Sequence, residues 1–299
     1  MSNFEIVGST NEPTPRTTDI LLAEAAKDGT VPTRSFTGDE RVSGPILATV
    51  KASAATVWVA VDPSVTTPQV RVYCTDPDSP FAQAARDTRI EQSGEYLSVT
   101  VPPVTPAATS THRGTSTYIS GSGSSYSFGS MHINGGATRS VNGATFSAGA
   151  SGSFVNGHRG IEVELLLPTA SGLKADVSSG TVRTFGHMAA AQIESSAGSV
   201  HLESVGRAEV KASAGSVRIG QVAEWADVHA AAGSITVTSH TGHAARVRAS
   251  AGSIKFTIAP EATGYVDLRA SAGSITLHGS RRTDIQITAE SPAGTVRRH

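Results

Sequence analysis

A five-residue motif centred on glycine recurs through the C-terminal half of the chain. Its clearest copies span residues 196–200, 213–217, 231–235, 250–254 and 271–275, and looser copies lie at 178–182 and 292–296. The seven glycines are spaced 18, 17, 18, 19, 21 and 21 residues apart, and they are Gly180, Gly198, Gly215, Gly233, Gly252, Gly273 and Gly294. Regular self-similarity at this period indicates a repeat architecture.

Apolar and polar side chains alternate on both sides of each glycine. The position two residues after glycine is apolar in every copy: Val182, Val200, Val217, Ile235, Ile254, Ile275 and Val296. The positions five and seven residues before glycine are also apolar, whereas the position between them is polar or charged in most copies. A period of two is typical of half-buried strands. Each repeat therefore predicts a strand of about seven residues, a glycine turn, a shorter strand and a variable return.

A unit of this size cannot bury its apolar face alone, so the copies must stack on one another. We expect an all-β protein whose single chain forms a parallel β-solenoid, or β-helix, with rungs of 17–21 residues that lie about 4.8 Å apart. Glycine lies above glycine in such a stack because the sharp bend needs a φ angle that side chains resist. The Ser or Thr that follows each glycine then forms a ladder of hydroxyl groups.

The chain divides into four segments. Residues 1–40 are polar and predict an N-terminal arm with a short helix at 19–27. Residues 41–104 contain the first rungs, because the sequence at 51–59, KASAATVWV, echoes KASAGSVRI at 211–219. Residues 105–160 form an insertion rich in Ser, Thr and Gly, and residues 161–299 form the repeat solenoid.

The insertion permits two interpretations. Its 56 residues include 19 Ser or Thr, 11 Gly and no Asp or Glu, a composition that suits a mobile segment. The Asn-Gly pairs at 134–135, 142–143 and 156–157 lie between apolar positions, a pattern that favours β-hairpins. We expect projecting hairpins, and keep a mobile segment as the alternative.

Composition and charge exclude several classes of protein. The net charge is −1, so no overall field draws the chain to nucleic acid or to an anionic membrane, and we expect neither sequence-specific nucleic-acid recognition nor a membrane span. The single Cys74 excludes an internal disulfide and a cysteine-built metal site. Without a signal peptide or an apolar stretch of 18 residues, the expected location is the cytoplasm, with a phage particle or unconventional export as the alternatives.

Three stretches show similarity to a known family: residues 57–62 (VWVAVD), residues 161–168 (IEVELLLP) with 174–182 (KADVSSGTV), and the Ser-Ala-Gly-Ser repeats. On these residues the sequence resembles the DUF4097 family of bacterial β-solenoid proteins, which are described as adhesin-like. The resemblance covers about residues 45–299, except for the insertion. It implies the solenoid fold and an adhesin-like interaction role, and it carries over no catalytic residue.

One outward column offers a candidate binding surface. Three residues after each glycine the sequence has Arg183, His201, Arg218, Thr236, Lys255, Thr276 and Arg297. Stacked cations suit a polyanion such as an acidic glycan, a teichoic acid or a nucleic-acid backbone. The alternative is a solvated face, and the column lacks the interleaved aromatic side chains on which bases stack.

Other chemistry has weaker support. Asp176 with Glu194, and Glu209 with Asp227, lie on adjacent rungs at the separation of a retaining glycosidase pair, so a polysaccharide-degrading β-helix enzyme ranks third among the functions. The pair His240 and His243 lacks a third ligand, which favours a surface loop over a metal site. We therefore expect no catalytic residue, no cofactor and no metal.

The sequence thus predicts a non-enzymatic structural or interaction protein. The last rung, after Gly294, has Pro292 and the sequence Arg-Arg-His at 297–299 as its only protection against strand pairing, and no capping helix. We expect a second copy or another protein to cover this C-terminal edge, which makes the chain part of an oligomer or a larger assembly. The second hypothesis is a monomeric module that binds a glycan or polyanion through Arg183, Arg218, Lys255 and Arg297.

Overall fold

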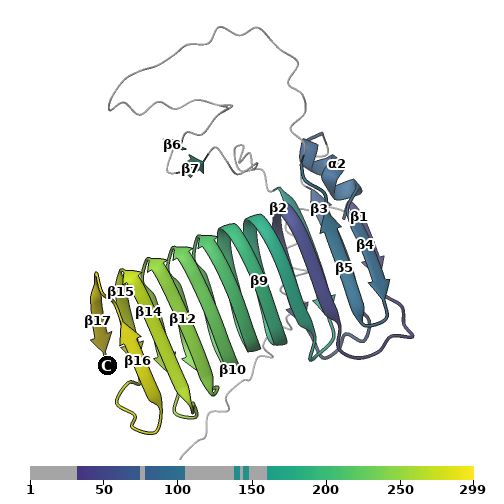
Figure 1. Ribbon diagram of the computed structural model, residues 1–299. Helices are drawn as coiled ribbons and strands as arrows, with labels where there is room; N and C mark the ends of the chain where they lie inside the picture. The colour runs from purple at the N-terminus through teal and green to yellow at the C-terminus, as the bar shows by residue number, and fades with distance from the viewer. Residues whose placement is uncertain (1–31, 75–77, 105–137, 142–143, 148–159) are drawn as a thin grey trace, which may run out of the picture.

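The computed structural model describes residues 32–74, 78–104, 138–141, 144–147 and 160–299. These residues are almost entirely β-structure: one sheet of 15 strands, a second sheet of two strands, and one short helix, α2 (Pro80–Arg86). The strands of the large sheet lie side by side in a long row, with the first strands at one end and β17 at the other (Figure 1). The prediction of an all-β protein is confirmed.

The glycine-centred repeats stack in parallel. Their strands are β9 (Gly172–Ala214), β10 (Val217–Ala232), β11 (Ile235–His240), β12 (Ala244–Ala251), β13 (Ile254–Ile258), β14 (Tyr265–Ala272), β15 (Ser274–His278), β16 (Gln286–Glu290) and β17 (Thr295–Arg298). Val217, for example, pairs with Val200 in one neighbouring repeat and with Ile235 in the other. This is the register that alignment on the glycines predicts.

Some strands are longer than the sequence predicts. β9 continues through Gly180 and Gly198, where two separate strands joined by a turn were expected. The difference has a physical cause, because the hydrogen-bonded ladder between neighbouring repeats extends around the bend. In a later repeat the Gly215 N–H donates to Ala232 O at 3.0 Å, and the Gly233 N–H donates to Ala251 O at 2.9 Å.

The inward columns form one core. Two residues after glycine, the six side chains from Val182 to Ile275 are at most 1% exposed. The small alanines seven residues before glycine, such as Ala208 and Ala245, are also buried and belong to the same core as larger side chains such as Phe256. Since burying apolar surface stabilises a fold by about 25 cal/mol per Å², this core is what holds successive repeats together.

The glycine corners are sites of close backbone approach. A Cβ atom added to any of the seven glycines would lie 1.6–1.9 Å from a carbonyl oxygen of the corner below, and for Gly180 that oxygen belongs to Ala55. The φ angles of the six glycines from Gly180 to Gly273 lie between 119° and 151°. Glycine is therefore required at these corners for two reasons: there is no space for a Cβ atom, and the backbone adopts a positive φ angle that other residues resist.

The N-terminal segment adds rungs in an order that differs from the chain order. β2 (Leu47–Val61) pairs with β9, and Val57 lies opposite Val182, as the sequence echo at 51–59 predicts. On the other side of β2 lie β5 (Tyr96–Val101) and β8 (Ile161–Leu167), which together form a further rung. The segment 105–160 thus joins two strands of one rung, at the place where the later rungs have their glycine corner.

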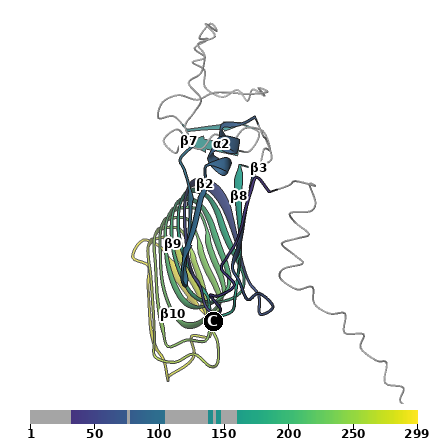
Figure 2. The same cartoon turned by 90° about the vertical axis from the view of Figure 1, so that its right-hand side faces the viewer.

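Antiparallel strands close this end of the sheet. β3 (Gln69–Cys74) pairs with β8, β1 (Arg34–Thr37) pairs with β3, and β4 (Arg89–Ser93) pairs with β5. In the view turned by 90°, the stacked repeats lie one behind another and α2 lies beside the strands of this end (Figure 2). The sequence analysis missed α2, a seven-residue helix that begins at Pro80 and buries Ala82, Ala84 and Ala85.

Two predicted features fall largely outside the described residues. The helix expected at 19–27 lies outside them, and so do the Asn-Gly pairs at 134–135, 142–143 and 156–157. Within the insertion, β6 (Thr138–Val141) and β7 (Ala144–Ser147) pair as an antiparallel two-stranded sheet on either side of positions 142–143. The four-segment division of the chain stays a prediction.

The corner geometry predicts a large cost for one added methyl group. Gly252→Ala would place its Cβ 1.9 Å from the Gly233 carbonyl oxygen at a φ of 142°. We expect a loss of about 2 kcal/mol or more in the free energy of unfolding, because strain and overlap act together. Urea titration followed by circular dichroism measures it. Ser250→Ala is the matched control at the same corner, and an equal loss in both variants would contradict the steric explanation.

Candidate functional site

The outward position three residues after each glycine forms one continuous column along the stack. Strand register and side-chain proximity order it as Trp58, Arg183, His201, Arg218, Thr236, Lys255, Thr276 and Arg297. We call these eight residues the basic column. Its four cations occupy alternate rungs, and the rungs between them carry His201, Thr236 and Thr276.

The four cations of the basic column are exposed. Within the part of the chain that the structure describes, none of Arg183, Arg218, Lys255 and Arg297 forms an ion pair. The seven segments that carry the column, from 181–185 to 295–299, contain a single acidic residue, Glu203. A Glu203 carboxylate oxygen accepts a hydrogen bond from the Gly186 N–H at 3.0 Å. The structure thus assembles the predicted column and leaves its positive charge uncompensated along this face.

Trp58 is the member of the basic column that sequence analysis missed. The guanidinium carbon of Arg183 lies 5.3 Å from the centroid of the indole ring, and the Phe185 ring stacks on Trp58 at 6.0 Å with 8° between the planes. Trp58 thus extends the column by one rung and adds an aromatic side chain at its end, next to Arg183. The echo at 51–59 contained the signal, because it aligns Trp58 with Arg218 and so with the column.

His201 lies between Arg183 and Arg218 and responds to both. Burial lowers the pKa of its imidazole below the usual 6.5, and the two positive neighbours lower it further. A neutral imidazole at pH 7 offers one donor and one acceptor nitrogen. This rung therefore presents a hydrogen-bonding group between two cations.

A buried carboxyl group continues the column beyond Trp58. Glu164 pairs in register with Trp58 on one side and with Arg71 on the other, and it is 9% exposed. Burial raises the pKa of Glu164, while a hydrogen bond from the Tyr73 hydroxyl and the charge of Arg71 act in the opposite direction. The alternation of apolar and polar residues at 161–168 indicates that Glu164 points out of the core. Its neighbours Arg71 and Tyr73 could be identified only from the fold.

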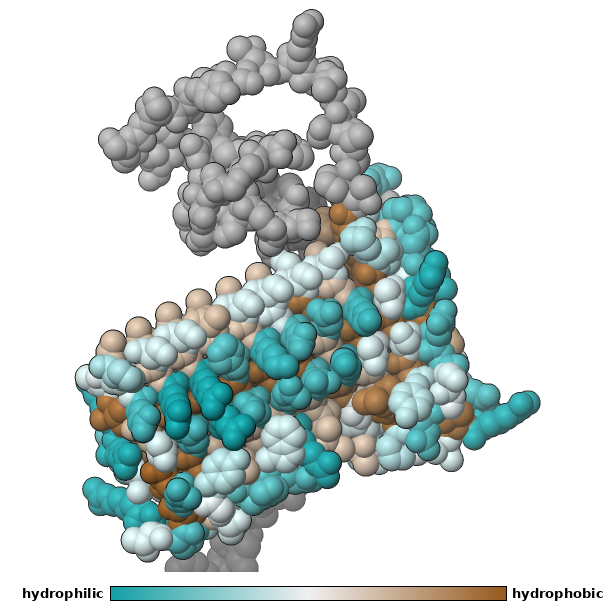
Figure 3. Space-filling view, viewed as in Figure 1, coloured by the Kyte–Doolittle hydropathy of each residue, from teal (hydrophilic) through white to brown (hydrophobic). Residues whose placement is uncertain are grey.

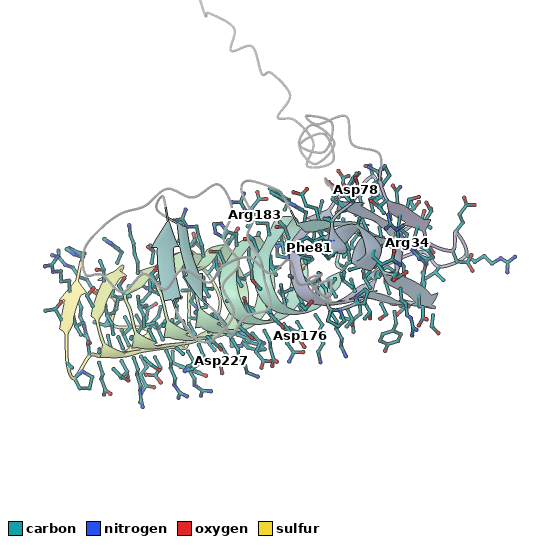
Figure 4. The ribbon with its side chains drawn as sticks, turned by 90° about the horizontal axis from the view of Figure 1, so that it is seen from above. Arg34, Asp78, Phe81, Asp176, Arg183 and Asp227 are labelled. Atoms are coloured by element: carbon teal, nitrogen blue, oxygen red, sulfur yellow. The ribbon has the colours of Figure 1, made fainter. Side chains whose placement is uncertain are left out.

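The opposite face carries charges of both signs, and most of them are paired. Asp176 and Asp227 lie on the other side of the stack from Arg183 (Figure 4). A hydrophilic band crosses β10, β12 and β14 on this face (Figure 3). Lys211 Nζ lies 3.4 Å from Glu194 and 3.0 Å from Glu209, and Arg246 lies 3.4 Å from Asp227.

These ion pairs bear on the glycosidase alternative. Glu209 and Asp227 are neighbours in register, as the sequence predicts. A cation nevertheless lies against each of them, whereas a glycosidase needs one carboxyl group that stays protonated to act as acid. The arrangement suits cross-strand charge pairing at the surface better than acid–base chemistry.

The histidine pair is divided between the core and the surface. His240 is fully buried between Val222 and Ile258 in its column, and His243 is exposed. The expected surface loop is therefore wrong for His240, because its strand continues an apolar column. Among the described residues, no group of three His, Cys, Asp or Glu side chains is placed to hold a metal ion. Cys74 is 8% exposed, as expected of a small core residue.

His240 predicts an acid-sensitive fold. Neither ring nitrogen has a hydrogen-bond partner among the described residues, and burial, followed by the charge of His243, lowers its pKa from 6.5 to about 4. The unfolded chain then binds a proton more readily, so stability falls as the pH drops from about 6.5 to 4, by roughly 3 kcal/mol at most. His240→Leu should flatten this part of the stability profile in urea titrations at several pH values. The exposed control His229→Ala should leave it unchanged, and a profile that is the same in His240→Leu would disprove the assignment.

No helix among residues 32–74, 78–104 and 160–299 is long and apolar enough to span a bilayer. None of the curated proteins matches this chain in sequence.

Two solved structures are similar to this chain at low sequence identity. A "putative adhesin" from Bacteroides fragilis NCTC 9343 is 13% identical, with a TM-score of 0.35 over 89% of this chain and 97% of its own. A "putative cell adhesion protein" from Clostridium sporogenes ATCC 15579 is 7% identical, with a TM-score of 0.34 over 90% of this chain and 99% of its own.

A family model matches most of the chain. The match runs from residue 82 to residue 299, which includes α2 from its third residue onward, the rung formed by β5 and β8, and all seven glycine corners. This confirms the resemblance that the Ser-Ala-Gly-Ser repeats indicated. The chain belongs to the Toastrack DUF4097 family.

Proposed function

We propose that this protein is a non-enzymatic interaction protein, a parallel β-solenoid scaffold that associates with a second copy of itself through its C-terminal edge. The observation that carries the proposal is the exposure of the last rung. Val296 is 37% exposed, although the equivalent residue of every earlier glycine repeat is at most 1% exposed. All four residues of β17 are exposed.

The residues of this rung support a covered edge. Terminal repeats that face water usually carry a polar outer face. Here the inward positions stay apolar, with Ile287 and Ala289 in β16 and Val296 in β17. Among the described strands, β17 pairs only with β15, and an apolar rung with a free strand edge is a template for strand addition.

The backbone of β17 has hydrogen-bonding groups to offer. The N–H groups of Thr295 and His299 donate to Gly273 and Leu277 in the preceding rung. Because successive residues of a strand point their backbone groups to opposite sides, those of Val296 and Arg298 face away from the stack. These are the groups that another strand would pair with.

The two ends of the sheet favour a closed pair over a filament. The N-terminal end is finished with the antiparallel strands β1 and β4, whereas the C-terminal end presents β16 and β17. Contact between like ends around a two-fold axis gives a dimer that terminates itself. Arg297 and Arg298 bring like charges to this contact, so association should strengthen as salt screens them.

The oligomeric state of the full chain tests the proposal. Light scattering behind a sizing column should give twice the chain mass, and the dimer fraction should rise with salt. Arg298→Pro removes an outward N–H without breaking a bond to β15, and it should shift the protein to monomer. Arg298→Ala removes the same charge, keeps the N–H and should remain dimeric.

Two outcomes would overturn the proposal. One is a wild-type protein that stays monomeric at every salt concentration. The other is a dimer that Arg298→Pro leaves intact while circular dichroism shows the same fold in both variants, because the contact would then lie elsewhere.

A further inference from the structure

We propose that the basic column binds a linear acidic polysaccharide that carries one anionic group per disaccharide, laid along the stack with its charges in register with Arg183, Arg218, Lys255 and Arg297. This inference goes beyond the assembly proposed above and does not depend on it. It rests on where charges lie, how far apart they are, and what lies between them.

Paired and unpaired charges are segregated between the two faces of the stack. On the face of Asp176 and Asp227, Lys211, Arg246 and Arg269 each lie within 4.0 Å of a carboxylate. On the face of the basic column, the four cations have no ion-pair partner among the described residues, and Glu203 is the one acid in the seven segments. Alternating signs would serve solubility equally well on both faces. Four like charges in line favour a ligand with a line of opposite charges.

The cations of the basic column are evenly spaced along the stack. Arg218 pairs with His201 on one side and with Thr236 on the other, and Thr236 pairs with Lys255. Adjacent cations of the column are thus two strand spacings apart, or about 9.6 Å. The two glycosidic oxygens on opposite sides of a pyranose ring lie about as far apart as neighbouring strands, so each sugar of an extended polysaccharide covers close to one rung. A glycan with one carboxylate or sulfate per disaccharide therefore repeats its charge at the spacing of the column.

Hydrogen-bonding side chains lie between the cations. His201, Thr236 and Thr276 are half-buried and carry groups that both donate and accept hydrogen bonds. Sugar hydroxyls of the uncharged unit would lie opposite these rungs. At the first rung the indole of Trp58 holds Arg183 over the sheet and adds a half-buried aromatic surface.

The same features disfavour a nucleic acid. A single nucleic-acid strand carries a phosphate about every 3.4 Å when stacked as in a duplex, so most of its charges would have no cation. Strands without secondary structure are usually held by aromatic side chains on which successive bases stack. Trp58 alone, at one end of the column, offers one such surface.

A titration with defined oligosaccharides tests the proposal. The probe is a fluorescent hyaluronan octasaccharide, which has one carboxylate per disaccharide, and the readout is anisotropy at low salt. We expect binding that weakens as salt rises. The triple variant Arg183→Ala, Arg218→Ala, Lys255→Ala should weaken it about tenfold or more. The matched control Lys211→Ala, Arg248→Ala, Arg269→Ala removes the same charge from the opposite face and should bind like the wild type.

A charge-relocation variant isolates the spacing. Arg218→Thr combined with Thr236→Arg keeps the composition and the net charge but moves one cation by one rung. If the column reads charge spacing, this variant binds the octasaccharide several-fold more weakly than the wild type. Equal binding would overturn the proposal, and so would equal losses in the two triple variants.

Competitors and assembly state complete the test. Dextran, which is neutral, should not compete, and a thymidine oligonucleotide should compete less well than hyaluronan at equal charge. No binding at low salt, or preference for the oligonucleotide, would overturn the proposal. The Arg298→Pro variant should bind as tightly as the wild type, so failure of the dimer and failure of this site give different results.

Discussion

The structure depends on the close approach of backbone to backbone at the glycine corners. The carbonyl oxygen of each corner occupies the space that a Cβ atom of the next corner would need, at 1.6–1.9 Å. The chain can turn in the same place in each repeat only because this position is glycine. This turn fixes the register of both flanking strands, because a shift of one residue would move the apolar side chains from the core to the surface. The same register places the outward side chains of successive rungs in line, including those of the basic column.

The alignment gives the two broad faces different chemistry. On one face, carboxylates and cations pair at 3.0–3.4 Å, within a rung for Lys211 with Glu209 and between neighbouring rungs for Arg246 with Asp227. Such pairs are exposed and contribute little to stability individually, but they leave this face nearly balanced. On the other face, the cations of alternate rungs meet hydrogen-bonding side chains instead of acids. A stack of parallel strands aligns the side chains at one position of the repeat in a single line, and a line of groups suits a linear ligand.

The ends of the stack are less regular than its body because each end has only one neighbouring rung. The N-terminal end consists of antiparallel strands, the helix α2, and a rung made of β5 and β8. This rung lies further from the glycine repeats than β2, although β2 comes before both strands in the chain. None of these elements contains the glycine-centred motif, so the repeat pattern gives no information about them. The alanines of the helix favour helix over strand, but seven residues are too few for a helix that is stable by itself. Its place is decided by contact with β3 and β8 rather than by local preference.

The sequence by itself determined the repeat, the inward and outward columns, and the membership of Arg183, Arg218, Lys255 and Arg297 in one line, because all of these follow from counting residues from a glycine. It also placed residues 51–59 as a rung, through their echo of 211–219. Only the tertiary structure decided that β8 lies between β2 and β3, that Trp58 stands beside Arg183 with Glu164 behind it, and that His240 is buried. Those facts join segments far apart in the chain, such as β3, β8 and β2. A side chain that occurs in one rung only leaves no periodic pattern in the sequence. Its neighbours therefore depend on how the strands at the ends of the stack pack together.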